Sequence, residues 1–479
     1  MKKTLVERNF EWVTILATGF VTGVLTLATL RHGVVFTPCS WGFWEGSVSL
    51  LEHGRYEFFG GQPMGPWSPF YALWFAAFQK LLGVSGWSVA IALAAMSALA
   101  ACIWCGFVLY LAPDNPDGPQ RARRWLIAAS SVAIGFLLMT TQYSPQANAL
   151  QLLFVPLSAV LAVRLHMEDK PRRLALASLL FLVVAILMSL AHYTGLIYIP
   201  AAALLLLFNP HFRLSRLFPL AALFAGAGIF VCWQFIMPWF KLSGSYEQAA
   251  TPVTKAFSWD MLTLLSRGWG KETPAVYACQ LLEGLGQFFL PHKLAWVGIP
   301  VVVAIGAWLL QQAVRTVLKY RSLCRGEREN VEARLGVPLA CVTLYIFVGL
   351  AALYVAYNTQ YLFDPLQGRF LWTPALAAIA ILLVVVQRRF PRFLLPVFLA
   401  LALFPGTRAA KYITRGVVER QRLEDNVFTN NVARPYYIIS SLPGTRAPSR
   451  DKMIVNPPDY SWIRRKPLGG NLEMTQPKP

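Results

Sequence analysis

Acidic, basic and aromatic side chains gather in a polar stretch that follows the first apolar segment of the chain. Glu45 and Glu52 lie seven residues apart there, and on a helix this spacing puts both carboxylates on one face. Arg55 and Tyr56 follow directly. A carboxylate can take a proton from a hydroxyl group, and a cation can stabilise a departing negative charge. The stretch is therefore a candidate acid–base site.

A second interpretation of this stretch is purely structural. Its apolar residues recur with helical spacing, at Trp41, Trp44, Val48 and Leu51. A helix of this kind can lie on a membrane surface, with tryptophan at the level of the headgroups and its acids in water. The spacing alone leaves both the interfacial anchor and the acid–base site open.

Three more polar residues lie beside later apolar segments. His192 and Tyr193 follow one such segment, and Arg369 precedes another. A histidine at a helix end more often makes a structural hydrogen bond than binds a ligand, and an arginine there can extend its side chain to the membrane interface. The position of Arg369 would also suit a cation that holds a lipid-linked phosphate.

No motif in the sequence indicates a metal, a nucleotide or another cofactor. Cys102 and Cys105 form a CxxC pair, but they lie within the apolar run 89–111, with no His or acidic residue nearby. This setting favours packing within a membrane over a redox or metal site. We therefore expect no cofactor, and nothing in the sequence supports a divalent metal.

The candidate residues must be positioned by apolar segments, because 56% of the 479 residues are hydrophobic and only 14% are charged. Soluble domains carry roughly a quarter charged residues. Uncharged runs of about 20 residues, long enough to span a bilayer as helices, recur along this chain. Alternating strands of a membrane barrel are not visible. The expected fold class is an all-α polytopic membrane protein.

About eleven transmembrane helices are expected. They lie at 12–30, 86–112, 125–142, 148–163, 174–191, 195–208, 217–240, 294–311, 336–357, 371–387 and 393–406. The apolar segment 69–83 is short, begins with proline and contains Lys80, so we expect a juxtamembrane helix that does not span. With this assignment, the loops expected inside carry 21 Lys and Arg, and those outside carry 9 when Lys80 is included. This bias follows the positive-inside rule.

The same assignment gives a domain organisation. A transmembrane domain covers 1–406, with juxtamembrane helices in an outer loop at 31–85, and a short soluble extension at 407–479 is expected outside the membrane. Lys2, Lys3 and Arg8 put the N-terminus in the cytoplasm. The net charge of +20 reflects these basic loops, which would contact anionic membrane lipids, and we expect no nucleic acid as a partner.

The loops together resemble those of the GT-C-fold glycosyltransferases, a superfamily that includes the protein O-mannosyltransferases and the aminoarabinose–lipid A transferases. The resemblance covers most of the chain from about residue 10 to 405. The segments that carry it are Leu50-Leu-Glu-His-Gly54, Ser68-Pro-Phe-Tyr71 leading to Leu81-Leu-Gly83, His192-Tyr-Thr-Gly195, Phe288-Phe-Leu-Pro291 and Arg369-Phe-Leu-Trp-Thr-Pro374. These motifs are short and loose.

The resemblance implies a hexosyl- or pentosyltransferase of the plasma (inner) membrane that acts on the extracytoplasmic face. Its donor would be a polyprenyl-phosphate-linked sugar and its acceptor a lipid, a glycan or a protein. Cys39 stands where the first loop of the family has an Asp, which leaves Glu45, and then Glu52, as the catalytic carboxylate. Arg369, with His192 and Arg55 as secondary candidates, would hold the phosphate.

By the same resemblance, Tyr56 and Tyr193 would border the sugar. Three other functions stay open. A polysaccharide polymerase or ligase would also use lipid-linked glycans, but it usually has paired arginines in its large outer loops. A lipid or solute transporter would carry ionisable residues within its spans. Cys39 also fits a catalytically silent relative.

Overall fold

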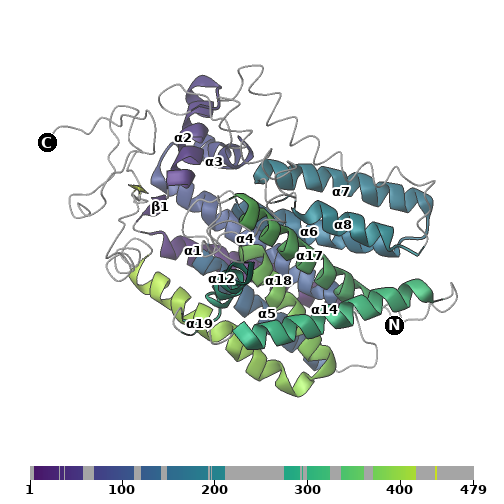
Figure 1. Ribbon diagram of the computed structural model, residues 1–479. Coiled ribbons are helices and arrows are strands. Elements are labelled where there is room, and N and C mark those ends of the chain that lie inside the picture. The colour runs from purple at the N-terminus through teal and green to yellow at the C-terminus, as the bar shows by residue number, and fades with distance from the viewer. Residues whose placement is uncertain are drawn as a thin grey trace.

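The computed structural model describes most of the helical part of the chain. The described residues are 5–31, 33–36, 38–57, 69–112, 120–141, 148–192, 195, 197–210, 274–291, 294, 299–323, 336–360, 371–416 and 437–439. Within these ranges, nine helices are long and apolar enough to cross a membrane. The chain is therefore an all-α polytopic membrane protein, as expected (Figure 1).

The helices that could each cross a membrane are α1 (Leu5–Thr29), α4 (Gly86–Leu111), α5 (Gln120–Thr141), α6 (Asn148–Met167), α7 (Pro171–Ala191), α14 (Ile299–Ser322), α17 (Val337–Gln360), α18 (Trp372–Arg389) and, after the turn η4 (Pro391–Phe393), α19 (Leu394–Arg415). Four shorter helices are α2 (Pro38–His53), α3 (Pro69–Leu82), α8 (Tyr198–Leu207) and α12 (Pro274–Gly286). The strands β1 (Val34–Phe36) and β2 (Tyr437–Ile439) complete the described elements.

One expected span has a much shorter helix than predicted, and another lies outside the described residues. The span expected at 195–208 is the ten-residue helix α8. Pro200 lies in its first turn, where its missing N–H is tolerated, and Tyr198 already stacks on Tyr345 of α17. A ten-residue helix rises about 15 Å, half of a bilayer core. The span expected at 217–240 lies outside the described part of the chain.

The last span is longer than the sequence pattern indicated. We expected it to end at 406, but α19 continues to Arg415. Ala409 and Tyr412 are buried and continue the apolar stripe of Leu401 and Pro405 at helical spacing. The charged residues near the end of α19 interrupt the apolar pattern in the sequence, so the stripe was not recognised there. The expected boundary between the transmembrane domain and the tail, at 406, therefore falls inside a helix.

A small antiparallel sheet joins the stretch after α1 to the tail that follows α19. Val34 of β1 pairs with Ile439 of β2, and Phe36 pairs with Tyr437. Arg31 adds a second link, because its guanidinium donates hydrogen bonds to the carbonyls of Ile413 and Thr414 at the end of α19. The end of α1, the end of α19 and the tail strand therefore lie at one end of the bundle, which we call the loop end.

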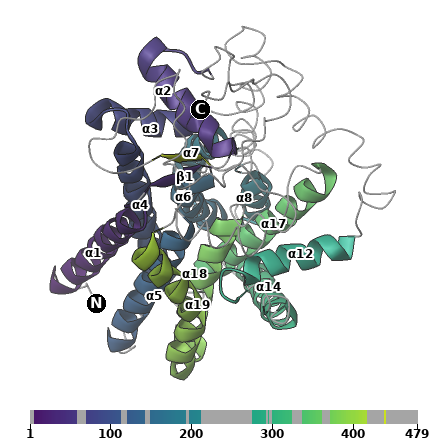
Figure 2. The same cartoon turned by 90° about the vertical axis from the view of Figure 1, so that its left-hand side faces the viewer.

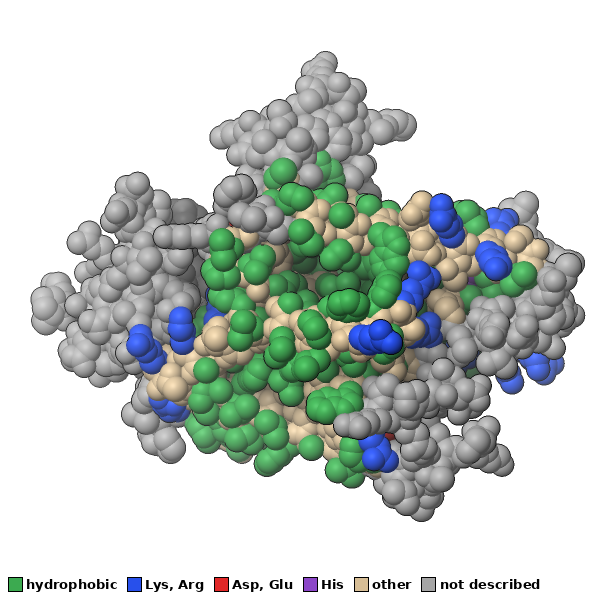
Figure 3. All heavy atoms as spheres, turned by 90° about the horizontal axis from the view of Figure 1, so that it is seen from below, with side chains coloured by type: hydrophobic (Ala, Val, Ile, Leu, Met, Phe, Trp, Pro, Cys, Tyr) green, Lys and Arg blue, Asp and Glu red, His purple; other side chains and the backbone are tan. Residues whose placement is uncertain are grey.

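The opposite end of the bundle, which we call the Glu11 end, is where α1 begins. Arg123 of α5 donates a hydrogen bond of 2.7 Å to Glu11, and another to the carbonyl of Ala112 after α4. Short connections follow between α5, α6 and α7, so successive helices run in opposite directions. Figure 3 shows hydrophobic side chains spread over one face of the bundle, with Lys and Arg toward its two sides.

Small residues bring α1 and α4 together. A Cβ atom on Gly19 would lie 2.9 Å from the carbonyl oxygen of Ala98, and one on Gly23 would lie 3.2 Å from that of Ala94. These glycines form a GxxxG pattern, which lets two membrane helices approach closely. Cys102 faces the same contact, and its thiol lies 3.5 Å from the carbonyl of Ile15.

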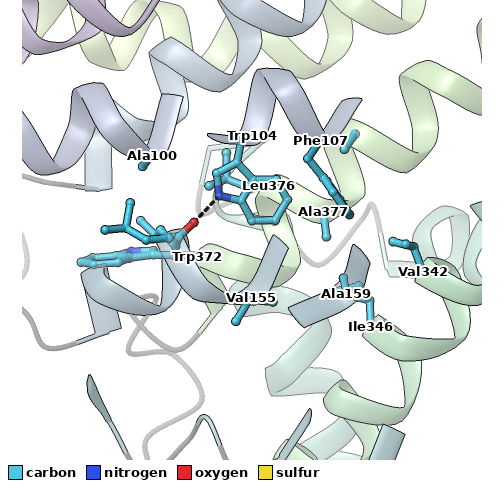
Figure 4. Close-up of a cluster of buried hydrophobic side chains, with 14 of the residues drawn as sticks. Ala100, Trp104, Phe107, Val155, Ala159, Val342, Ile346, Trp372, Leu376 and Ala377 are labelled. Atoms are coloured by element: carbon cyan, nitrogen blue, oxygen red, sulfur yellow. Dashed lines mark hydrogen bonds between the residues drawn. The ribbon is translucent and has the colours of Figure 1, made fainter. Parts of the chain in front are cut away.

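A proline in α6 is compensated by a tryptophan of α4. Pro156 has no N–H, so the carbonyl of Leu152 loses its helical partner. The indole N–H of Trp104, a fully buried side chain, donates a hydrogen bond of 2.9 Å to that carbonyl. Figure 4 shows this bond within a cluster to which α4, α6, α17 and α18 all contribute. The core of the bundle is centred here.

Candidate functional site

The helices α2 and α3 lie together at the top of the views in Figures 1 and 2. Aromatic rings join them: Phe43 packs edge-on against Tyr71 with ring centroids 5.3 Å apart, and Tyr71 packs in the same way against Phe75 at 4.8 Å. Trp44 is fully buried and lies 6.3 Å from the ring of Phe36 in β1. The first half of α2 is thus held by packing on two sides.

A buried polar pair fixes the same contact. The amide nitrogen of Gln79 in α3 donates a hydrogen bond of 3.1 Å to Ser47 Oγ in α2, and both side chains are buried. Trp74 of α3 donates a 3.1 Å hydrogen bond to the carbonyl of Ala92, which ties α3 to α4. The 14-residue helix α3, expected as a juxtamembrane segment, is therefore anchored from both sides.

Glu45 and Glu52 lie on α2 in different environments. Glu45 is 5% exposed, whereas the side chain of Glu52 is 49% exposed and lies 3.7 Å from that of His53. Ser49, between them on the same face, is 1% exposed. Within the described part of the chain, its hydroxyl has no hydrogen-bond partner. The face that carries both carboxylates thus runs from the interior of the protein to its surface.

The turn after α2 carries Arg55 and Tyr56. Gly54 ends the helix with φ of 66°, a left-handed conformation that glycine adopts without strain. Arg55 is exposed, and Tyr56 is half-buried. Burial raises the pKa of the Tyr56 hydroxyl, so that this group is a neutral hydrogen-bond donor at physiological pH. The turn places an exposed cation and a neutral phenol directly beyond Glu52.

The backbone of His192 has a structural role at the end of α7. Its carbonyl accepts a hydrogen bond of 3.1 Å from Gln151 of α6, and its N–H closes the end of α7 on Met188. Gly195 follows closely, because a Cβ there would lie 2.6 Å from the carbonyl oxygen of Met188. The His-x-x-Gly spacing is therefore explained by the chain turning back on α7, and the His192 side chain is partly exposed.

The structure brings part of the expected site together. Glu45, Glu52, Arg55 and Tyr56 share one helix and the turn that follows it, and α3 contacts both α2 and α7. Tyr193 and Arg369 lie outside the described residues, as does the side chain of Cys39. Among the described residues, no three of His, Cys, Asp and Glu come close enough together to hold a metal ion.

Two residues of this region were missed from the sequence. Gln79 adjoins Lys80 in an otherwise apolar segment, and a polar amide there is a signal for a buried hydrogen bond. Ser49 lies four residues after Glu45, on the face of that carboxylate, and this spacing also could have indicated it. No protein-family model matches the chain, and no curated protein or solved structure matches it either.

Proposed function

We propose that this chain is a membrane glycosyltransferase of GT-C-like architecture. It would move a hexose or pentose from a polyprenyl-phosphate donor to a lipid, glycan or protein acceptor at the loop end of the bundle. The observation that carries the proposal is Glu45, a carboxylate that is 5% exposed on a short helix at that end. A buried carboxylate beside a surface turn that carries a cation and a phenol is a candidate functional group.

The proposed reaction needs one proton acceptor and one anion-binding group. The acceptor hydroxyl attacks the anomeric carbon, its proton passes to the carboxylate of Glu45, and the bond from that carbon to the phosphate oxygen breaks. The polyprenyl phosphate leaves with the electron pair, and inversion at the anomeric carbon follows. Glu52 is the second choice as base because it is half-exposed and less shielded from water.

Cations would stabilise the leaving phosphate. Arg369 is the first choice by the resemblance described above, with His192 and Arg55 as secondary candidates. Arg55 is supported by its exposure directly after α2, and His192 by its position at the end of α7. Tyr56 and Tyr193 would border the sugar. No step in this scheme uses a metal.

We also propose that the loop end faces away from the cytoplasm in the plasma (inner) membrane, and that the N-terminus is cytoplasmic. Basic residues support this orientation. In the described helices and their connections, those toward the Glu11 end are Arg8, Arg121, Arg123, Arg124, Arg164, Lys170, Arg172, Arg173, Arg315, Lys319, Arg321, Arg388, Arg389 and Arg392. Those at the loop end are fewer: Arg31, Arg55, Lys80, Arg408, Lys411 and Arg415.

The places where the described helices end support the expected number of spans. Asn209, just after α8, donates a 2.6 Å hydrogen bond to the carbonyl of Leu165 near the end of α6, so the chain is then at the Glu11 end. Arg321, in the last turn of α14, lies over the ring of Phe208, so α14 ends there too and begins at the loop end. The chain must cross between 210 and 299, which supports the span at 217–240 and a total of about eleven.

The test is a transfer assay in membranes with radiolabelled polyprenyl-phosphate sugars. Glu45→Gln should lower the rate by about 10²–10⁴-fold, the usual contribution of a general base. Glu283→Gln, a carboxylate on α12, is the matched control and should leave the rate unchanged. Arg369→Ala should reduce transfer as well.

Unchanged transfer in both Glu45→Gln and Arg369→Ala would remove these residues from the site. If Glu52→Gln alone abolishes transfer, then the exposed carboxylate is the base. If wild-type membranes transfer none of the lipid-linked sugars but move a lipid or solute across sealed vesicles, the chain is a transporter.

A further inference from the structure

A second polar site lies at the Glu11 end, far along the chain from α2. A cavity of about 90 Å³ opens between α14, α17 and α18. Its polar lining comes from Gln312, Thr316, Thr343, Arg388 and Arg389, and Trp308 forms part of its wall. The cavity has room for a group the size of a few water molecules, such as a phosphate, but not for a whole lipid.

Neutral groups orient one of the two arginines. The guanidinium of Arg389 lies over the ring of Trp308, 5.4 Å from its centroid. Two of its nitrogens lie 3.4 and 3.5 Å from the side-chain oxygen of Gln312, which accepts long hydrogen bonds from both. Trp308 and Gln312 are both neutral, so neither of these partners neutralises the positive charge of Arg389.

The cavity concentrates positive charge. Arg388 and Arg389 are neighbours at the last turn of α18, and Arg388 is half-buried. Every described residue that lines the cavity is neutral or basic. An anion that lies between two neighbouring cations is attracted to both of them. Planar guanidinium groups bind the oxygens of phosphate and of carboxylate in pairs, so both kinds of anion suit the two arginines.

The position and the apolar wall of the cavity favour a lipid as the source of the phosphate. The apolar span of α18 ends at Arg389, so the cavity lies at a membrane boundary. Leu309, Leu339 and Val385 add an apolar wall, which suits the glycerol and acyl part of a lipid rather than a free ion in water. Basic pockets between spanning helices on the cytoplasmic side commonly bind anionic headgroups.

We propose that this cavity binds the headgroup phosphate of an anionic phospholipid from the leaflet at the Glu11 end. Arg388 and Arg389 hold the phosphate, Gln312 and Trp308 keep Arg389 in place, and the apolar wall receives the glycerol end of the acyl chains. The site is separate from the proposed transfer reaction and does not depend on it.

The connector between α14 and α17 offers the competing occupant. It carries Glu327, Glu329 and Glu332, which lie outside the described residues. A carboxylate from this connector could neutralise the arginines in place of a lipid. The experiment must therefore separate three sources of negative charge: a lipid headgroup, free phosphate and the connector.

Binding is measured on the purified full chain in a zwitterionic detergent at physiological salt, by native mass spectrometry and by the shift of the melting temperature. The probes are phosphatidylglycerol, phosphatidylcholine and inorganic phosphate. Arg388→Gln/Arg389→Gln should weaken phosphatidylglycerol binding about 25-fold, since one basic residue near a membrane contributes about fivefold. Arg388→Lys/Arg389→Lys should bind with intermediate affinity, because it keeps the charge and loses the planar fork.

The matched control is Arg315→Gln/Lys319→Gln. It removes the same charge from exposed positions of α14 that do not line the cavity, and should weaken binding less than about threefold. Unaltered melting without lipid shows that each variant is folded. Phosphatidylcholine and inorganic phosphate should bind at least tenfold more weakly than phosphatidylglycerol.

Three outcomes would overturn the proposal. Equal losses in the cavity variant and the control would mean that only surface charge acts. Inorganic phosphate that binds as tightly as phosphatidylglycerol would make the site one for a free ion. If the wild type does not bind phosphatidylglycerol but Glu327→Gln/Glu329→Gln/Glu332→Gln does, the connector is the occupant. Unchanged affinity in that triple variant supports the lipid.

Discussion

The hydrogen bond from Trp104 to Leu152 gives a quantitative test of how α4 and α6 are held together. Replacing Trp104 with Phe removes the indole donor and leaves the Leu152 carbonyl without a partner, because Pro156 cannot supply an N–H. A buried carbonyl without a partner costs about 1–3 kcal/mol. The smaller ring also leaves a void, since Trp104 is fully buried and packs edge-on against Phe107 at 5.5 Å.

A double-mutant cycle separates these two effects. In a Pro156→Ala background, the helix N–H of residue 156 can bond the Leu152 carbonyl, so Trp104→Phe then leaves nothing unpaired. The packing loss is present in both backgrounds and cancels. Cross-helix hydrogen bonds in membranes contribute only about 0.6 kcal/mol on average, because the unfolded chain finds other partners. The Leu152 carbonyl lacks such a helical alternative, so we expect a coupling of about 1–2 kcal/mol.

The assay is reversible unfolding of the purified protein in mixed micelles as the denaturing detergent is increased. The free energy of unfolding is compared for the wild type, the two single variants and the double variant. Pro405→Ala in α19 is the control, since Pro405 is also inside a helix. The cost of Trp104→Phe in the free energy of unfolding should add to that of Pro405→Ala without coupling. Equal costs of Trp104→Phe with and without Pro156 would refute the reasoning.

The remaining predictions use the same unfolding measurement. Gly19→Ala should destabilise the protein by about 1–3 kcal/mol, because the added Cβ would lie 2.9 Å from a backbone oxygen of α4; Gly106→Ala, with nothing within 4 Å, should not. Gln79→Ala should cost about 1–3 kcal/mol through the lost bond to α2 and a small cavity. Arg31→Gln should cost about 1–2 kcal/mol, since two carbonyls at the end of α19 lose a charged donor. Arg55→Gln, at an exposed position, should change the free energy of unfolding by less than about 0.5 kcal/mol.

The long helices could be predicted from the sequence because a bilayer imposes one simple requirement, about 20 apolar residues in a row. Hydropathy predicts the ends of a helix poorly where contacts with other helices determine them. Helix α8 has only ten residues, yet the chain runs from the loop end at His192 to the Glu11 end at Asn209. The stacked Tyr198 and the buried Asn209 hold the two ends of the helix. The end of α19 is long because Tyr412 continues a buried stripe among charged neighbours. Neither contact is visible in a running average of hydropathy.

The candidate site, too, could be predicted only in part from the sequence. The spacing of Glu45 and Glu52 predicted that both would share one face of a helix, and the structure has them on one continuous helix. Which of them would be buried could not be predicted, because burial depends on α3, which is brought against α2 by Ser47 and Gln79. The close approach of α1 and α4 could have been predicted, since Gly19 and Gly23 form a recognisable pattern.

The side on which the tail lies could not be derived from its charge, because long segments cross membranes largely regardless of charge. In the structure, two contacts place the tail strand relative to α2. Arg31 binds the last carbonyls of α19, and Val34 of β1 pairs with Ile439 of β2, so the tail strand and the start of α2 lie at the same end of the bundle. A labelling reagent that reaches the tail strand from one side of the membrane should therefore also reach Glu52 from that side. The proposed reaction would take place on the same side.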